Sequence, residues 1–239
     1  MTESYLSPLL ISLKTVLTTT IITFLLGIAA ARWMARYSGR FKSLIDGIFI
    51  LPLVLPPTVV GFGLLFLFGK NGPLGRLLEL VGTTVVFTWP ATVISAVVMC
   101  FPLMYMSSRG GFEQVDSNIE NAARTLGASE WRIFWTVTMP LAWPAIMAAT
   151  ILAFARSLGE FGATLMLAGN IPGKTATIPV AIYFNIQAGH TDQAMILVII
   201  VLAISFISLA ALAYYKRKAI KSLRYYPKMV QDFFNVIFF

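Results

Sequence analysis

The sequence contains five apolar runs that are each long enough to cross a lipid bilayer, which takes about 20 mostly apolar residues in a helix. The runs cover residues 9–34, 48–68, 85–106, 142–168 and 194–215. A soluble domain is about half apolar and about a quarter charged, whereas this chain is 58% hydrophobic and 12% charged. The pattern therefore predicts an all-α, polytopic membrane helix bundle of about five spanning helices.

A sixth apolar piece, residues 178–186, is too short to cross the bilayer. It is expected to form a re-entrant or surface helix, and the sequence leaves open whether the segment 178–188 is a sixth membrane element.

The distribution of Lys and Arg predicts the orientation. Four basic residues lie at the end of the first run or between the first and second runs, three lie between the third and fourth runs, and six follow the fifth run. With five spans, all of these fall on one side, and only Lys70, Arg76 and Lys174 fall on the other. Cytoplasmic loops are enriched in Lys and Arg, so the amino terminus is predicted outside and the carboxyl terminus in the cytoplasm. The transmembrane domain would cover residues 1–218. The basic and aromatic tail 219–239 would lie on the anionic inner leaflet.

Prolines interrupt the second run. Pro52, Pro56 and Pro57 remove backbone donors within a few residues, and the freed carbonyls need partners from other helices or water. Gly61 and Gly63 follow and favour close helix approach. The pattern fits a helix that lines a pathway and fits a simple structural kink equally well.

Two charges lie inside the fourth run. Arg156 and Glu160 are four residues apart and are expected to share one helix face. Charges inside a span are costly and are usually paired or placed in a watery cavity. The pair is interpreted as a structural lock, with a role in an anion path or gate as the alternative.

The loop 116–140 between the third and fourth runs predicts two short helices. Ser117 and Glu120 fit a capping box at the start of the first helix, and Gly127 is placed to end it. The small and apolar residues of this helix recur at helical spacing on one face: Ile119, Ala122, Ala123 and Leu126.

The second helix is expected to start with Ser129 as its cap and to close at Pro140. Its aromatic residues are Trp131, Phe134 and Trp135. On these residues alone, a pair of interfacial helices lying on the lipid is slightly favoured over a protein-docking element.

The stretch Glu120-Asn-Ala-Ala-Arg-Thr-Leu-Gly-Ala128, followed by Pro140, resembles the "EAA" loop of ABC importer permeases. Ala122, Ala123 and Gly127 match the two alanines and the glycine of that motif. The position before the alanines, acidic in the family, is Asn121 here, with Glu120 one position earlier. The resemblance implies that the loop inserts into a cleft on an ATP-binding subunit.

Three further segments are similar to the molybdate permease branch of that family: 51–61, 154–163, and 169–173 together with 177–179. The resemblance runs from about residue 9 to residue 213 and implies the MetI-like permease fold. It also implies import of an oxyanion, molybdate or tungstate, with sulfate as the alternative because sulfate permeases share much of the pattern. The protein would be a multi-pass component of a bacterial or archaeal cytoplasmic membrane.

The resemblance implies a set of partners: two cytoplasmic ABC ATPase subunits, an external oxyanion-binding protein, a second copy of the permease, and membrane lipid, but no nucleic acid. ATP and Mg²⁺ would be used by the ATPase, so no cofactor is expected in this chain. The candidate coupling residues are Glu120, Ala122, Ala123, Gly127 and Pro140. The candidate pore or gate residues are Pro56, Pro57, Gly61, Arg156, Ser157 and Glu160.

Other function classes find little support in the sequence. An intramembrane enzyme would need a catalytic set such as HExxH or GxSxG, and neither occurs. A secondary transporter usually shows internal repeats, which are not visible. The stretch 168–175 looks like a relaxed P-loop, but it follows a spanning run and is expected to form an external turn. A single cysteine, Cys100, and a single histidine, His190, predict neither a disulfide nor a metal site.

Overall fold

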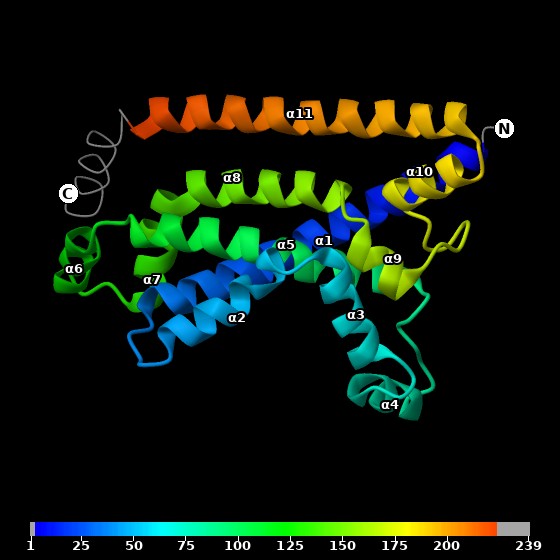
Figure 1. Cartoon of the computed structure of the whole chain (residues 1–239). Coiled ribbons are helices and arrows are strands. Elements are labelled where there is room, and N and C mark those ends of the chain that lie inside the picture. The colour runs from blue at the N-terminus through cyan, green and yellow to red at the C-terminus, as the bar shows by residue number, and fades with distance from the viewer. Residues whose placement is uncertain (1–2, 224–239) are drawn as a thin grey trace.

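The computed structural model describes residues 3–223, and every regular element in this part of the chain is a helix (Figure 1). The helices are α1 (Glu3–Arg36), α2 (Lys42–Val54), α3 (Pro57–Phe68), α4 (Pro73–Leu80), α5 (Trp89–Glu113), α6 (Ser117–Thr125), α7 (Glu130–Ile133), the π-helical turn η1 (Phe134–Thr138), α8 (Met139–Leu158), α9 (Gly162–Ala168), α10 (Ile178–Gln187) and α11 (Thr191–Leu223).

The described residues contain four helices that are long and apolar enough to cross a membrane: α1, α5, the continuous α7–η1–α8 helix and α11. The bent pair α2–α3 makes up to five if it is counted as one span. This confirms the predicted all-α membrane bundle of about five spans. α10 has ten residues and is about 15 Å long at 1.5 Å per residue, so it is too short to cross.

The second predicted span is not one helix. α2 and α3 meet at a bend of 112°, far sharper than the kink that the prolines suggested. Leu55 is extended, with ψ of 147°, because a residue before proline is sterically driven out of the helical region. Pro57 then starts α3 at a position where its missing N–H costs nothing.

The fourth predicted span, 142–168, differs at both ends. α8 stops at Leu158, and the separate helix α9 starts at Gly162. At the other end, the helix begins twelve residues before the predicted span, at Glu130, and runs on through η1. Pro140 therefore lies in the first turn of α8. The prediction that it closes the preceding helix is wrong.

The π-helical turn explains how the chain passes Pro140 without stopping. A proline ring crowds the carbonyl four residues earlier and removes one hydrogen bond. In η1 the ladder shifts by one residue, so that the N–H of Met139 donates to the carbonyl of Phe134. Such single π-helical turns occur inside longer α-helices, and here the turn lets the helix continue through Pro140.

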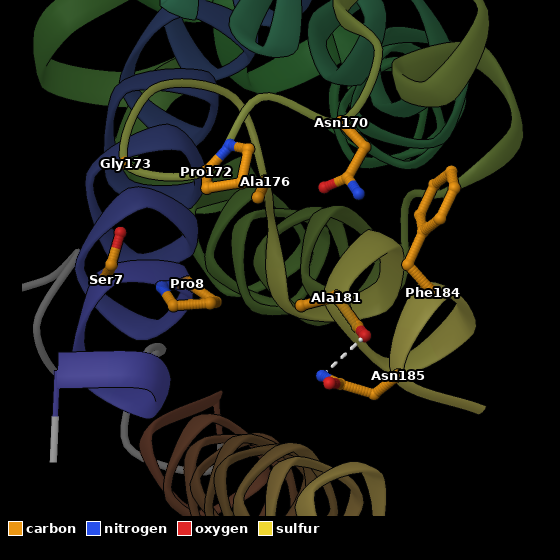
Figure 2. Close-up of a pocket in the computed structure, with 9 residues that line it drawn as sticks. All are labelled: Ser7, Pro8, Asn170, Pro172, Gly173, Ala176, Ala181, Phe184 and Asn185. Carbon is orange, nitrogen blue, oxygen red and sulfur yellow. Dashed lines mark hydrogen bonds between the residues drawn. The ribbon is translucent and has the colours of Figure 1, made fainter. Parts of the chain in front are cut away.

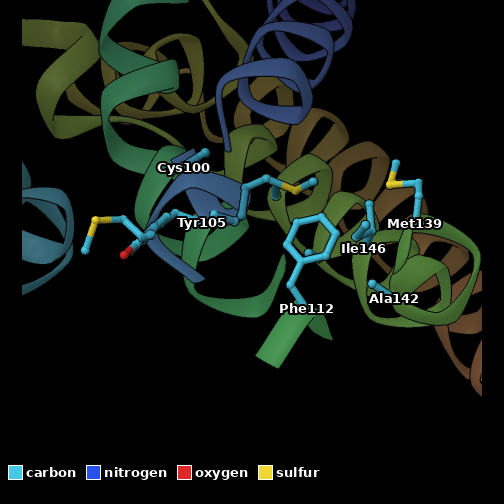
Figure 3. Close-up of a cluster of buried hydrophobic side chains, with 11 residues drawn as sticks. Cys100, Tyr105, Phe112, Met139, Ala142 and Ile146 are labelled. Carbon is cyan, nitrogen blue, oxygen red and sulfur yellow. The ribbon is translucent and has the colours of Figure 1, made fainter. Parts of the chain in front are cut away.

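α5 is the central helix of the bundle and contacts α1, α2, α3, α8 and α9. Its apolar stretch is 61% buried, whereas that of α11 is only 17% buried. Figure 3 shows the main core between α5 and α8, with Cys100, Tyr105, Phe112 and Ile146 packed together. Small residues bring these helices close, since a side chain on Gly111 would lie 2.7 Å from the Cβ of Ala145.

The two ends of the bundle carry different features (Figure 1). α6, α7 and the turn between α1 and α2 lie at one end. The first turns of α1, the 169–177 loop and α10 lie at the opposite end. Five crossings put the start of α1 and the end of α11 at opposite ends, as predicted, while the orientation in the membrane stays a prediction. The predicted tail starts inside α11, and its residues 224–239 lie outside the described part of the chain.

Candidate functional site

The start of α6 differs from the predicted capping box. Asp116 is the cap residue, and its carboxylate accepts a hydrogen bond of 2.9 Å from the backbone N–H of Asn118. Ser117 is the first residue inside the helix. Asp116 was missed because Asp and Ser are both good caps, and the spacing to Glu120 favoured Ser117.

Glu120 instead holds α6 to the rest of the protein. Its Oε1 accepts a hydrogen bond of 2.5 Å from the Thr138 hydroxyl in η1. Its carboxylate lies 3.8 Å from Arg32 and 3.8 Å from Arg36, both on α1. The Glu120 side chain is 15% exposed, so these contacts are partly shielded from water and connect α6 to two of the spanning helices.

Glu130 extends this network to the start of α7. Its carboxylate lies 2.8 Å from Arg36 and accepts a 2.6 Å hydrogen bond from Nε of Arg124. The hydrogen bond to Glu130, followed by the contact with Glu120, raises the pKa of the Arg124 guanidinium. Three arginines and two glutamates thus join α1, α6 and α7.

The predicted docking face of α6 is open. Ile119 is 39% exposed and Leu126 is 51% exposed, while Ala122 is exposed and Ala123 is half-buried. Gly127 ends the helix with φ of +80°, as its predicted stop role requires. The Ser129 hydroxyl accepts from the N–H of Arg132 at 3.4 Å, which confirms it as the cap of α7.

The other set of candidates lies around the break between α8 and α9. Arg156 is in the last turn of α8, and its Nη1 lies 2.9 Å from Oε2 of Glu160. Glu160 itself is outside the helix, so the prediction that the two share a helix face is wrong, although they do pair. Oε1 of Glu160 accepts from the N–H of Ala163 at 3.1 Å. Ser157 is buried and donates to the carbonyl of Phe154.

The start of α3 packs against this same break. A Cβ added to Gly61 would lie 2.7 Å from the Cα of Ala163, and one on Gly162 would lie 3.0 Å from Pro57. Gly61 therefore permits the predicted close helix approach. Gly63 does not, because nothing in the described chain lies within 4 Å of its added Cβ. Pro56 is exposed. The structure thus brings Pro57 and Gly61 against Gly162 and Ala163, the residues that follow Glu160.

Comparison with known proteins decides the family. Residues 23–221 match the family described as "Binding-protein-dependent transport system inner membrane component". The chain belongs to this family. A molybdenum transport system permease protein, ModB, from Escherichia coli K12 is 46% identical over 87% of this chain and 92% of its own length. YvgM from Bacillus subtilis, a putative molybdenum transport system permease protein, is 44% identical with the same two coverages.

Solved structures show the same fold at low sequence identity. A bacterial ABC transporter involved in the import of alginate aligns with a TM-score of 0.74 at 16% identity, over 92% of this permease and 80% of that chain. The MetNI methionine ABC transporter aligns with a TM-score of 0.64 at 15% identity, over 88% of this permease and 95% of that chain. The MetI-like permease fold is therefore confirmed. Members of the family are membrane components of transport systems and not enzymes.

The permease also contains a polar cluster that sequence reasoning missed. Asp46 on α2 accepts hydrogen bonds from Tyr105 and Arg109 on α5, and Arg109 also donates to Glu113 at 2.7 Å. Asp46 and Arg109 both lie outside the predicted spans 48–68 and 85–106, so the sequence analysis did not pair them. The available signal was that Tyr105 and Arg109 are four residues apart, on one helix face.

A pocket of about 260 Å³ lies at the end of the permease opposite α6. Figure 2 shows it between the first turns of α1, the loop after α9 and α10, with Ser7, Asn170 and Asn185 among its polar residues. The P-loop-like stretch forms part of this wall. It makes turns at Gly169 and Gly173 with positive φ, and α10 begins only at Ile178, so it is an interhelical turn, as predicted.

Proposed function

We propose that this chain is the pore-forming subunit of an ATP-driven importer for molybdate or tungstate. The proposal rests on identity of 44–46% to two permeases named for molybdenum transport, over 87% of this chain. Sulfate is the second candidate, because a probable sulfate transport system permease protein from Chlorokybus atmophyticus is 34% identical over 84% of the chain. The difference in identity favours molybdate.

The observation that supports coupling to ATP hydrolysis is the way in which α6 is attached to the spanning helices. Glu120 joins this short helix to Thr138 and to Arg32, while the face with Ala122 and Leu126 is open. A short helix held in this way can seat in a cleft of an ATPase subunit and pass a rigid-body displacement to α1 and α8. A helix that only rested on lipid would not need a network of five charges behind it.

The importer would contain two copies of this chain, two cytoplasmic ATPase subunits and an external binding protein. One structural relative is an alginate transporter in complex with a periplasmic protein, which supports the last partner. The substrate path would run between the two copies, since one chain with about five spans is small to enclose a channel. α2 has no buried residue in the described chain, so it has surface available for the second copy or the path.

Within this path, the α3 start and the α8–α9 break are the proposed gate region. Arg156 is 32% exposed, whereas its partner Glu160 is 2% exposed. The guanidinium is therefore the more accessible partner of the pair, although the pairing weakens its attraction for an anion. The protein would reside in the cytoplasmic membrane of a bacterium or archaeon, with α6 on the cytoplasmic side.

The substrate is tested by reconstituting the permease with its ATPase and binding protein in liposomes. Molybdate or tungstate, added with the binding protein, should stimulate ATP hydrolysis severalfold over the unliganded binding protein. Stimulation by sulfate alone would replace molybdate with the second candidate. Absence of stimulation by all three anions, with the complex intact on a sizing column, would overturn the oxyanion proposal.

A further inference from the structure

A groove with a volume of about 470 Å³ runs between α1 and the α7–η1 segment. Its walls are formed by apolar and aromatic residues, which include Phe24, Leu25, Ile28, Phe134, Trp135 and Met139. Arg32, Arg36 and Glu130 line one end. The groove is thus an apolar trough with a charged end, and none of the proposed transport roles uses it.

The charged end has a surplus of positive charge. Arg32, Arg36 and Arg124 face two carboxylates, those of Glu120 and Glu130, in the network behind the groove. The Arg36 side chain is 40% exposed, so it can donate to a further acceptor. The guanidinium of a flexible arginine side chain beside apolar walls can donate hydrogen bonds to a lipid phosphate at the membrane surface.

The length and position of the groove also suit a lipid. From Phe24 to Arg36 a helix rises about 18 Å at 1.5 Å per residue, close to the half-thickness of about 15 Å of a bilayer's hydrocarbon core. Trp131 and Trp135 are 72% and 49% exposed beside the charged end. Tryptophans at this position are typical of the membrane–water interface.

We propose that this groove binds one anionic phospholipid, with an acyl chain along Phe24 and Ile28 and its phosphate beside Arg36. The site would lie at the end that carries α6, next to the residues that hold this helix. Bound lipid would then pack against α1 and α7 and support the network around Glu120. The proposal concerns a lipid ligand and does not depend on which anion is transported.

The test is native mass spectrometry of the purified full-length chain in detergent, with added phosphatidylglycerol or phosphatidylcholine of identical acyl chains. Wild type should retain phosphatidylglycerol about fivefold better than phosphatidylcholine, a difference of about 1 kcal/mol. Ala29→Trp fills the groove and should reduce retention of both lipids. Ala203→Trp, on the exposed surface of α11, is the matched control and should retain both.

The headgroup contact is tested separately. Arg36→Gln should remove the preference for phosphatidylglycerol, and Arg36→Lys should keep part of it. Arg40→Gln, a nearby arginine that stacks on Phe41, should leave the preference intact. Equal loss in Ala29→Trp and Ala203→Trp, or equal retention of the two lipids by wild type, would overturn the proposal. So would an Ala29→Trp variant that keeps its lipid but loses the second copy or the ATPase, because the groove would then be a protein interface.

Discussion

Glu120 and Glu160 each form ion pairs at a place where the helices of this permease are interrupted, but their surroundings differ. Glu120 lies in the α6 loop, is 15% exposed, and contacts three arginines and a threonine. Glu160 lies in the break between α8 and α9, is 2% exposed, and contacts one arginine and one backbone N–H. The first carboxylate shares its charge with a network near water, and the second is buried and depends on a single cation, Arg156.

This difference separates a part that can transmit motion from a part that fixes the bundle. Partly exposed ion pairs are individually weak, because water competes for each partner. A network of such pairs can rearrange without a large cost at any one contact. A buried carboxylate with one cation has no replacement when that contact is lost. We therefore expect changes around Glu160 to impair folding, and changes in the α6 loop to impair coupling.

The largest effect is expected for Glu160→Ala. It leaves Arg156 without its partner and removes the acceptor for the N–H of Ala163, at a cost on the order of 3 kcal/mol. The thermal midpoint of the purified permease in detergent should fall sharply, together with its yield. Glu79→Ala, which removes an exposed pair of 3.9 Å with Lys70, should change the midpoint little. An unchanged midpoint for Glu160→Ala would show that the pair is not a structural lock.

Gly127→Val should give the next largest effect, and it should act on transport more than on folding. Gly127 has φ of +80°, with nothing within 4 Å of an added Cβ, so the penalty is conformational and about 1–2 kcal/mol. The misplaced Ala122 and Ala123 should weaken copurification of the ATPase and lower uptake roughly tenfold or more.

Gly82→Val is the matched control for this change. Gly82 has φ of +71° and is equally free of neighbours, but it follows α4, away from α6 (Figure 1). It should cost similar stability and leave the ATPase bound. Normal uptake and a normally bound ATPase in Gly127→Val would favour the alternative in which α6 and α7 lie on the lipid surface.

The sequence predicted the elements that depend on local chemistry. Apolar runs located the spanning helices, because lipid forces each of them to be long and apolar. Gly127 and Ser129 were located correctly, because a helix stop and a helix cap depend on a few neighbouring residues. The bend of 112° between α2 and α3 was foreseen only as a kink, because prolines permit a bend and the packing of α3 on α9 sets its size.

The contacts that hold the candidate sites together could not be predicted in this way. Glu120 was expected to reach back to its own helix, but its partners Arg32 and Thr138 come from 88 residues before it and 18 residues after it. The contacts of Asp46 with Arg109 likewise join α2 to α5. Pairs of this kind depend on which helices become neighbours, and a single sequence carries little information on that.

A third effect is expected from the packing of α3 on the α8–α9 break, and it tests whether that region is as rigid as the buried Glu160 suggests. Gly61→Ala places a methyl group 2.7 Å from the Cα of Ala163. Because the neighbour is backbone, one of the two helices must shift, at a cost of about 1–3 kcal/mol. The thermal midpoint should fall, and the proposed gate should be disturbed, so uptake should fall with it.

Gly63→Ala provides the contrast two residues further along the same helix. Nothing in the described chain lies within 4 Å of the added Cβ, and alanine is favoured over glycine inside a helix by roughly 0.5–1 kcal/mol. Its midpoint should stay the same or rise. Equal midpoints for Gly61→Ala and Gly63→Ala would mean that α3 moves freely over α9. The region around Glu160 would then be a mobile gate element, and the contrast with the α6 loop would no longer hold.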